Sequence, residues 1–81
     1  MADRKNATVR WRNTVAAVIS ASRKDTDVSQ EDLAQRLGWS RWKLAKIEAG
    51  EGKVEFGELV LLARALKIEP ETLFRRMLRW D

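Results

Sequence analysis

The sequence predicts an all-α fold, a compact domain of five short helices in one chain of 81 residues. Apolar residues recur at helical spacing in five segments, and no segment alternates apolar and polar residues as a half-buried strand does. Capping signals separate the segments. Ser29 and Ser40 are good N-caps, while Gly38 and Gly50 suit the left-handed residue that often follows a helix.

The first helix is expected to begin at Thr8 and to run to about residue 24. Its inward side is predicted from four apolar residues at helical spacing, Trp11, Val15, Val18 and Ile19. Residues 1–8 are polar and basic and predict a flexible N-terminal arm, so the single domain is expected to cover residues 9–81.

Residues 29–49 predict two helices of about two turns joined by a tight turn. An apolar stripe follows Ser29 and ends at Gly38, and Ser40 then restarts the pattern with Leu44 and Ile47 on the buried side. Two such helices cannot bury a core alone. They are useful if one is held out for another molecule, and a helix fits the major groove of DNA.

Two more helices are predicted, over about residues 55–66 and from Pro70 onward, where the missing N–H of proline costs nothing. The inward side of the first is predicted from Phe56, Leu59, Leu62, Ala63 and Leu66. The second has surplus apolar residues, of which Leu78 and Trp80 are candidates for a homodimer contact. In the alternative, Trp80 covers the open end of the domain.

The composition favours a polyanion partner and excludes several classes of site. Sixteen Lys and Arg against twelve Asp and Glu give a net charge of +4, with basic residues concentrated near the N-terminus and in residues 40–53. A solvated basic surface is the alternative. The absence of Cys and His removes disulfides, thiolate metal ligands and the commonest general base. We expect no enzyme, metal, cofactor or small-molecule substrate.

No apolar run approaches the roughly 20 residues that span a bilayer, and the N-terminus has no apolar signal region. A cytoplasmic protein with no membrane association is therefore expected.

The pattern of residues from Val28 to Leu78 resembles the lambda-repressor-like helix-turn-helix family, also called the Cro/C1 or XRE type. The matching positions are residues 28–34, 37, 38, 40, 47, 48, 50, 59, 62, 63 and 66. The resemblance implies a five-helix DNA-binding domain, bacterial or phage-encoded, that commonly acts as a dimer on double-stranded DNA. The sequence departs from the family at Ala49, at Val54 and at Trp42, an unusual residue for the exposed face of the recognition helix.

Four residues of the helix over residues 40–49 are predicted to contact bases. With Leu44 and Ile47 inward, the outward side carries Trp42, with Ala45 and Lys46 beside it and Arg41 near the helix start. Arg41 can donate two hydrogen bonds to guanine. Trp42 has three interpretations: it contacts thymine methyls or sugars, it folds over neighbouring side chains, or it anchors a partner protein. Trp39, in the turn, is expected to pack in the core.

Phosphate contacts are predicted for Gln30, Ser40, Lys43 and Lys53. Gln30 lies at a helix start, where backbone N–H groups favour an anion, and the resemblance supports this role. Ser40 is a cap first, and the alternative for each of the others is a solvated side chain. The arm residues Arg4 and Lys5 either reach the DNA backbone or minor groove or are disordered.

The resemblance further implies a salt bridge between Arg23 and Glu48, which would orient the recognition helix and not contact bases. The predicted function is a sequence-specific DNA-binding transcriptional regulator. A repressor is favoured because a bare domain of this size has no second domain to recruit polymerase. The alternative is an antitoxin-like or phage-control module that binds a protein through Trp42 or the C-terminal helix.

Overall fold

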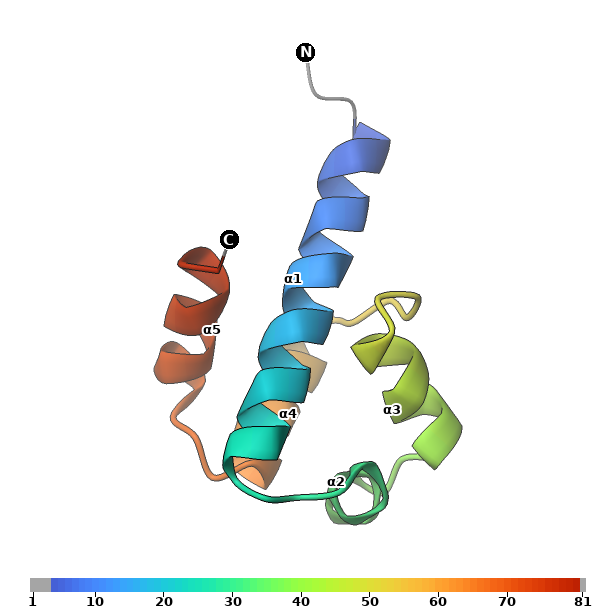
Figure 1. Ribbon diagram of the computed structural model, residues 1–81, viewed down its shortest axis with the longest axis vertical. Helices are drawn as coiled ribbons and strands as arrows, with labels where there is room; N and C mark the ends of the chain where they lie inside the picture. The colour runs from blue at the N-terminus through green and yellow to red at the C-terminus, as the bar shows by residue number, and fades with distance from the viewer. Residues whose placement is uncertain (1–3, 81) are drawn as a thin grey trace.

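Five helices form the fold in the computed structural model, which describes residues 4–80 and the side chains of residues 7–80. They are α1 (Arg4–Asp25), α2 (Gln30–Leu37), α3 (Arg41–Glu48), α4 (Phe56–Ala65) and α5 (Pro70–Leu78). Figure 1 shows α1 in the centre, α5 on one side, α3 on the other, α2 below and α4 behind. The described part contains no strand, so the predicted all-α fold is confirmed.

The core lies where the C-terminal half of α1 meets the other four helices. Helix α3 packs on α1 and α2, while α5 packs on α1 and α4. The largest fully buried side chains of the core are apolar, with the exception of Ser22. The hydroxyl of Ser22 accepts a hydrogen bond from Nη1 of Arg76 at 2.9 Å. The apolar ones are Val15, Val18, Ile19, Leu33, Leu44, Ile47, Leu62, Leu66 and Leu73.

The start of α1 differs from the prediction. The helix begins at Arg4 and not at Thr8, so it takes in residues 4–8 of the expected flexible arm. Arg, Lys and Ala are good helix formers, and extending an existing helix adds one hydrogen bond for each residue fixed. Residues 1–3 and the side chains of Arg4 and Lys5 lie outside the described residues, so their predicted DNA contact stays a prediction.

Two residues expected in the core are exposed. Trp11 is 43% exposed and Phe56 is 70% exposed, although both lie on the apolar side of their helices. Helix α1 has 22 residues and the other helices have eight to ten, so its N-terminal half extends past them. Trp11 is therefore only partly covered, whereas Phe56 is exposed at the first residue of α4.

Candidate nucleic-acid interface

The turn between α2 and α3 fixes the two helices against each other. Gly38 adopts a left-handed conformation with φ of 71°, and the next N–H, that of Trp39, donates to the carbonyl of Ala34 at 3.0 Å. A residue with a Cβ disfavours this φ, which is why glycine ends α2. Ser40 then caps α3, since its Oγ accepts from the N–H of Lys43 at 3.1 Å. The capping predicted for Ser40 is thus present.

The opposite end of α3 is held by a close approach to α1. Gly50 has φ of 78°, and a Cβ built there lies 2.7 Å from Oδ1 of Asn13. A side chain at this position would strain the backbone and would require the amide of Asn13 on α1 to move. Glycine therefore lets the chain leave α3 against α1.

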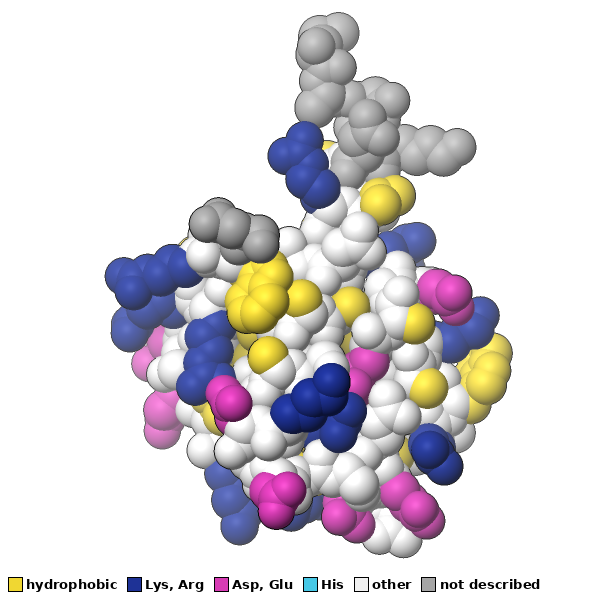
Figure 2. Space-filling view, viewed as in Figure 1, with side chains coloured by type: hydrophobic (Ala, Val, Ile, Leu, Met, Phe, Trp, Pro, Cys, Tyr) yellow, Lys and Arg dark blue, Asp and Glu magenta, His cyan; other side chains and the backbone are white. Residues whose placement is uncertain are grey.

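Helix α3 has one buried and one exposed side. Leu44 and Ile47 are buried in the core, whereas Arg41 and Trp42 are exposed and Ala45 and Lys46 are half-buried. Trp42 is 69% exposed. In Figure 2 an exposed hydrophobic side chain lies between basic ones at the edge of the molecule where α3 runs, while acidic side chains gather along the lower edge, at and beside α2.

The three basic residues of α3 have different surroundings. Arg41 makes no hydrogen bond or ion pair with any residue the structure describes. Lys46 lies over the indole of Trp42, with Nζ 4.8 Å from the ring centroid. Lys43 lies over the indole of Trp39 at 4.3 Å and forms an ion pair with Glu58 of α4 at 2.6 Å.

The two tryptophan–lysine pairs were not predicted from the sequence. Lys46 follows Trp42 by four residues within α3, the separation at which side chains on a helix meet. Lys43 also follows Trp39 by four residues, but Trp39 lies in the turn before the helix. A cation over an aromatic face is attracted by about 0.5–1 kcal/mol at exposed sites. Trp39 packs against the core, as expected. The spacing was therefore a signal that sequence reasoning overlooked.

Arg23 and Glu48 join the end of α1 to the end of α3. Nε and Nη2 of Arg23 donate to Oε2 and Oε1 of Glu48 at 2.8 and 2.9 Å, and Nη1 donates to the carbonyl of Val28 at 2.8 Å. The two side chains are 12% and 5% exposed. The hydrogen bond to Glu48 is the main cause that raises the pKa of Arg23, so the guanidinium stays charged.

Gln30 belongs to the same network, because its Nε2 donates to Oε1 of Glu48 at 3.2 Å. The side chain thus bridges the start of α2 and the end of α3. Lys53 lies exposed in the connection between α3 and α4. The predicted phosphate residues therefore surround α3, although Gln30 and Lys43 have partners within the protein.

Leu78 and Trp80 lie beside two different hollows. Leu78 is 83% exposed and borders an apolar groove together with Trp11, Phe56 and Phe74. The rings of Phe56 and Phe74 stack with their centroids 5.2 Å apart. Trp80 is 46% exposed and borders a hollow against α1. The two candidate dimer residues are therefore not brought together in one groove.

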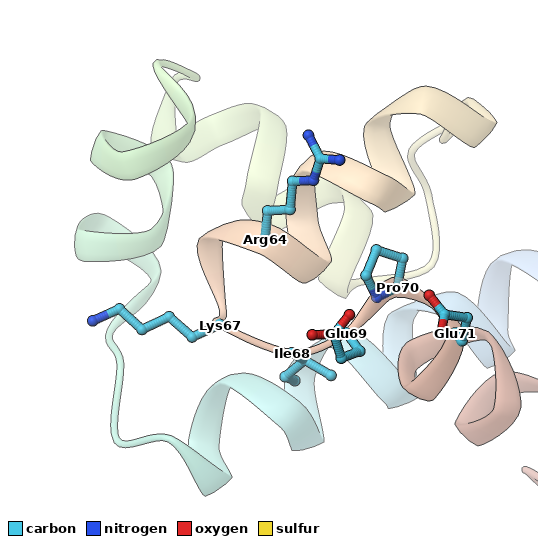
Figure 3. A pocket seen from close by; sticks show the side chains of 6 residues that line it. All are labelled: Arg64, Lys67, Ile68, Glu69, Pro70 and Glu71. Carbon is cyan, nitrogen blue, oxygen red and sulfur yellow. The ribbon is translucent and has the colours of Figure 1, made fainter.

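A further hollow lies at the connection of α4 and α5. Figure 3 shows Arg64 and Lys67 pointing away from each other there, so their charges do not converge on a common ligand. Among the described residues, no group of three or more acidic side chains is placed to hold a metal ion. No helix in this part is both long and apolar enough to cross a membrane.

Comparison with known proteins identifies the family. Residues 14–77 match the family described as "Helix-turn-helix domain". The chain belongs to this helix-turn-helix family. The resemblance predicted from the sequence is confirmed, and so is the function at its general level, a DNA-binding transcriptional regulator.

Three solved structures are similar to this helix-turn-helix protein. The restriction-modification controller protein C.AhdI from Aeromonas hydrophila is 32% identical, with a TM-score of 0.72 over 78% of this chain and 96% of that one. The wild-type controller C.Esp1396I is 23% identical, with a TM-score of 0.80 over 85% and 91%. The clp gene regulator ClgR from C. glutamicum is 22% identical, with a TM-score of 0.79 over 84% and 88%. The last two show the fold alone. No curated protein matches the sequence.

Proposed function

We propose that this protein represses transcription as a homodimer that recognises double-stranded DNA by sequence, with α3 in the major groove. The observation that carries the proposal is the two-sided α3, which buries Leu44 and Ile47 and presents an unpaired Arg41 beside an exposed Trp42. The similarity to a restriction-modification controller at 32% identity supports a role in gene regulation. A domain seated in the groove represses by occupying DNA that polymerase needs.

In this proposal the residues of α3 divide the work of recognition. Arg41 donates to guanine O6 and N7, the commonest specific contact in the major groove. Ala45 is small and allows close approach, and Lys46 reaches a base acceptor. Trp42 contacts thymine methyls or sugars, with its indole oriented by the lysine lying over it at 4.8 Å.

The phosphate contacts come from both sides of α3. Gln30 and Ser40 lie at the starts of α2 and α3, where backbone N–H groups also point at an anion. Lys53 lies exposed beyond the end of α3. Lys43 is bonded to Glu58 at 2.6 Å, so a phosphate competes with that carboxylate for it. The basic residues Arg4 and Lys5 are proposed to reach the DNA backbone from the N-terminus, outside the domain of residues 9–81.

A homodimer places two copies of α3 about one helical turn of DNA apart. Leu78 is proposed to make the contact, because it protrudes beside an apolar groove and an isologous interface needs such a self-complementary surface. Trp80 is proposed to extend that contact from its separate hollow.

The test is selection of bound duplexes from a random pool, followed by titration across a salt series. We expect one enriched two-fold symmetric sequence. The logarithm of affinity should fall by about 0.9 per logarithmic unit of salt for each phosphate neutralised. Absence of enrichment, with weak binding that does not depend on salt, would contradict the proposal.

That contrary result would favour a second function, a module that binds another protein. The exposed Trp42 and the apolar groove bordered by Phe56 and Leu78 are the observations that support it. A protein partner bound in the groove would protect Phe56 and Leu78 from labelling in the absence of DNA, whereas Trp42 would be protected by either kind of partner.

A further inference from the structure

Lys43 is held on two sides before any DNA arrives. Its Nζ lies 2.6 Å from Oε2 of Glu58 and 4.3 Å from the ring centroid of Trp39. Trp39 comes from the turn before α3, and Glu58 comes from the first turn of α4. The lysine that reaches out from the start of the recognition helix is therefore tied to two other parts of the domain.

Glu58 is itself fixed in place. Its Oε1 accepts from the backbone N–H of Glu55 at 3.0 Å, as half of the capping box that begins α4. The hydrogen bond from Lys43, followed by that from the Glu55 N–H, lowers the pKa of Glu58, which is thus ionised at neutral pH. The carboxylate is only 22% exposed and the lysine 41%. A phosphate that binds Lys43 therefore competes with a preorganised anion for the charge of the lysine.

The other basic residues of α3 differ in this respect. Arg41 makes no ion pair with any described residue, and Lys46 lies over Trp42 with no carboxylate beside it. Within the described part of the chain, Lys43 is thus the basic residue of α3 whose charge is already matched. The protein keeps a cation at the helix start and neutralises it from α4.

We propose that Glu58 is an intramolecular competitor of DNA phosphate for Lys43 and thereby restrains binding to non-specific duplex. The inference rests on the proposed DNA-binding function. Non-specific binding comes from phosphate contacts. When α3 lies loosely on a random duplex, no DNA phosphate is held at a fixed place beside Lys43 to replace the carboxylate of Glu58. Base contacts in the specific complex fix the register of α3 and hold one phosphate beside Lys43, so the exchange occurs there.

The experiment measures affinity for a random-sequence duplex and for the selected duplex across a salt series. Glu58→Gln keeps a side chain that still accepts from the Glu55 N–H, so α4 retains its cap. We expect affinity for the random duplex to rise at least about three-fold, the size of one exposed ion pair, with the salt slope steeper by about 0.9 per protomer. Affinity for the selected duplex should rise less, so specificity falls.

Two controls separate competition from a general loss of negative charge. Glu51→Gln removes an exposed carboxylate in the connection after α3, where Glu51 makes no ion pair with the described residues. Lys43→Met removes the cation and keeps its apolar stem. In the Lys43→Met background, Glu58→Gln should have no more effect than Glu51→Gln.

The proposal is overturned if Glu58→Gln raises the affinity for random duplex no more than Glu51→Gln does. It is also overturned if Glu58→Gln raises that affinity equally in the wild-type and Lys43→Met backgrounds. A second readout does not depend on the folding of any Glu58 variant. Lys43→Met alone should weaken binding to random duplex less than two-fold. A loss of two-fold or more, as large as that of Lys53→Met at an exposed phosphate residue, also overturns the proposal. If the wild-type protein binds no duplex, the DNA-binding function fails as well. If it binds normally and these comparisons fail, only the role of Glu58 falls.

Discussion

Arg41 differs from its basic neighbours because nothing in the described structure occupies its guanidinium. A planar group with five donors and no internal partner is suited to two parallel hydrogen bonds with guanine. Lys43 and Lys46 instead lie over indole rings, which restricts where their charges point. We therefore expect base recognition to depend on Arg41 more than on any other single residue of α3.

Replacing Arg41 with Ala should remove sequence preference without affecting folding. We expect a loss of about 1–3 kcal/mol of discrimination at one base pair of the selected duplex. The melting temperature should stay nearly constant, because exposed substitutions usually change stability by less than about 0.5 kcal/mol. Competition binding with single-base variants of the duplex measures the first effect.

Arg75→Ala is the matched control, since Arg75 is exposed on α5, which packs on α1 and α4. It removes the same charge away from α3. If both variants retain wild-type discrimination, Arg41 does not contact a base.

At the scale of helices, the ion pair between Arg23 and Glu48 joins α1 to α3, and we expect it to orient α3. A buried pair of this kind is weak evidence for stability, since removal of both charges is often neutral, but it fixes geometry through two parallel hydrogen bonds. Gln30 adds a third hydrogen bond to the same carboxylate. The network thus sets the ends of α1, α2 and α3 relative to one another.

Glu48→Leu should destabilise the protein by about 3 kcal/mol, because it leaves the guanidinium of Arg23 without its carboxylate. The double variant Arg23→Met with Glu48→Leu should recover most of that loss. Urea unfolding measures both values. A double variant as unstable as the single one would show that the stranded charge is not the cause.

The same double variant tests the positioning role. We expect it to fold and to discriminate less between the selected and random duplexes, because α3 is no longer held by directed hydrogen bonds. Full discrimination in a stable double variant would contradict a role for the pair in orienting α3.

The contact between α3 and α4 should depend on pH. The pKa of Glu58 is lowered by Lys43, so its stabilising effect is complete above the ordinary glutamate value of about 4.3 and is lost as pH falls through the lowered value. The glutamine introduced by Glu58→Gln does not titrate. The wild-type protein should therefore have a larger free energy of unfolding than this variant at pH 7, and the difference should disappear in acid. A difference that stays constant down to pH 3 would contradict the pairing.

The whole molecule leaves an apolar groove uncovered between α1, α4 and α5. It is bordered by Trp11, Phe56, Phe74 and Leu78, of which Trp11, Phe56 and Leu78 are exposed. A second copy of the chain would cover these side chains and align two α3 helices on one duplex.

Leu78→Lys should abolish the proposed homodimer. Its side chain is 83% exposed, so the fold of the single chain should be unaffected. We expect sedimentation velocity to show monomers and the affinity for the full symmetric duplex to fall, while affinity for one half-site stays the same. Leu61→Lys is the control, because Leu61 is also an exposed leucine but does not border the groove. If both variants dimerise to the same extent as the wild-type protein, the proposed contact is contradicted.

The sequence alone determined the number of helices, the turn at Gly38, the caps at Ser29 and Ser40 and the buried side of α3. These features depend on residues within one or two helical turns, where backbone preferences and apolar spacing act directly. The predicted start of α1 was wrong because helix extension depends on small propensities without a sharp signal.

Only the tertiary structure decided which charges are matched and which apolar side chains remain exposed. Lys43 and Glu58 are 15 residues apart, and nothing in local spacing brings them to 2.6 Å. Trp11 and Phe56 have the spacing of core residues, yet Trp11 lies on the part of α1 that extends past the other helices, and Phe56 is exposed at the first residue of α4. Local sequence fixes which side of a helix is apolar, but the packing of whole helices determines what covers that side.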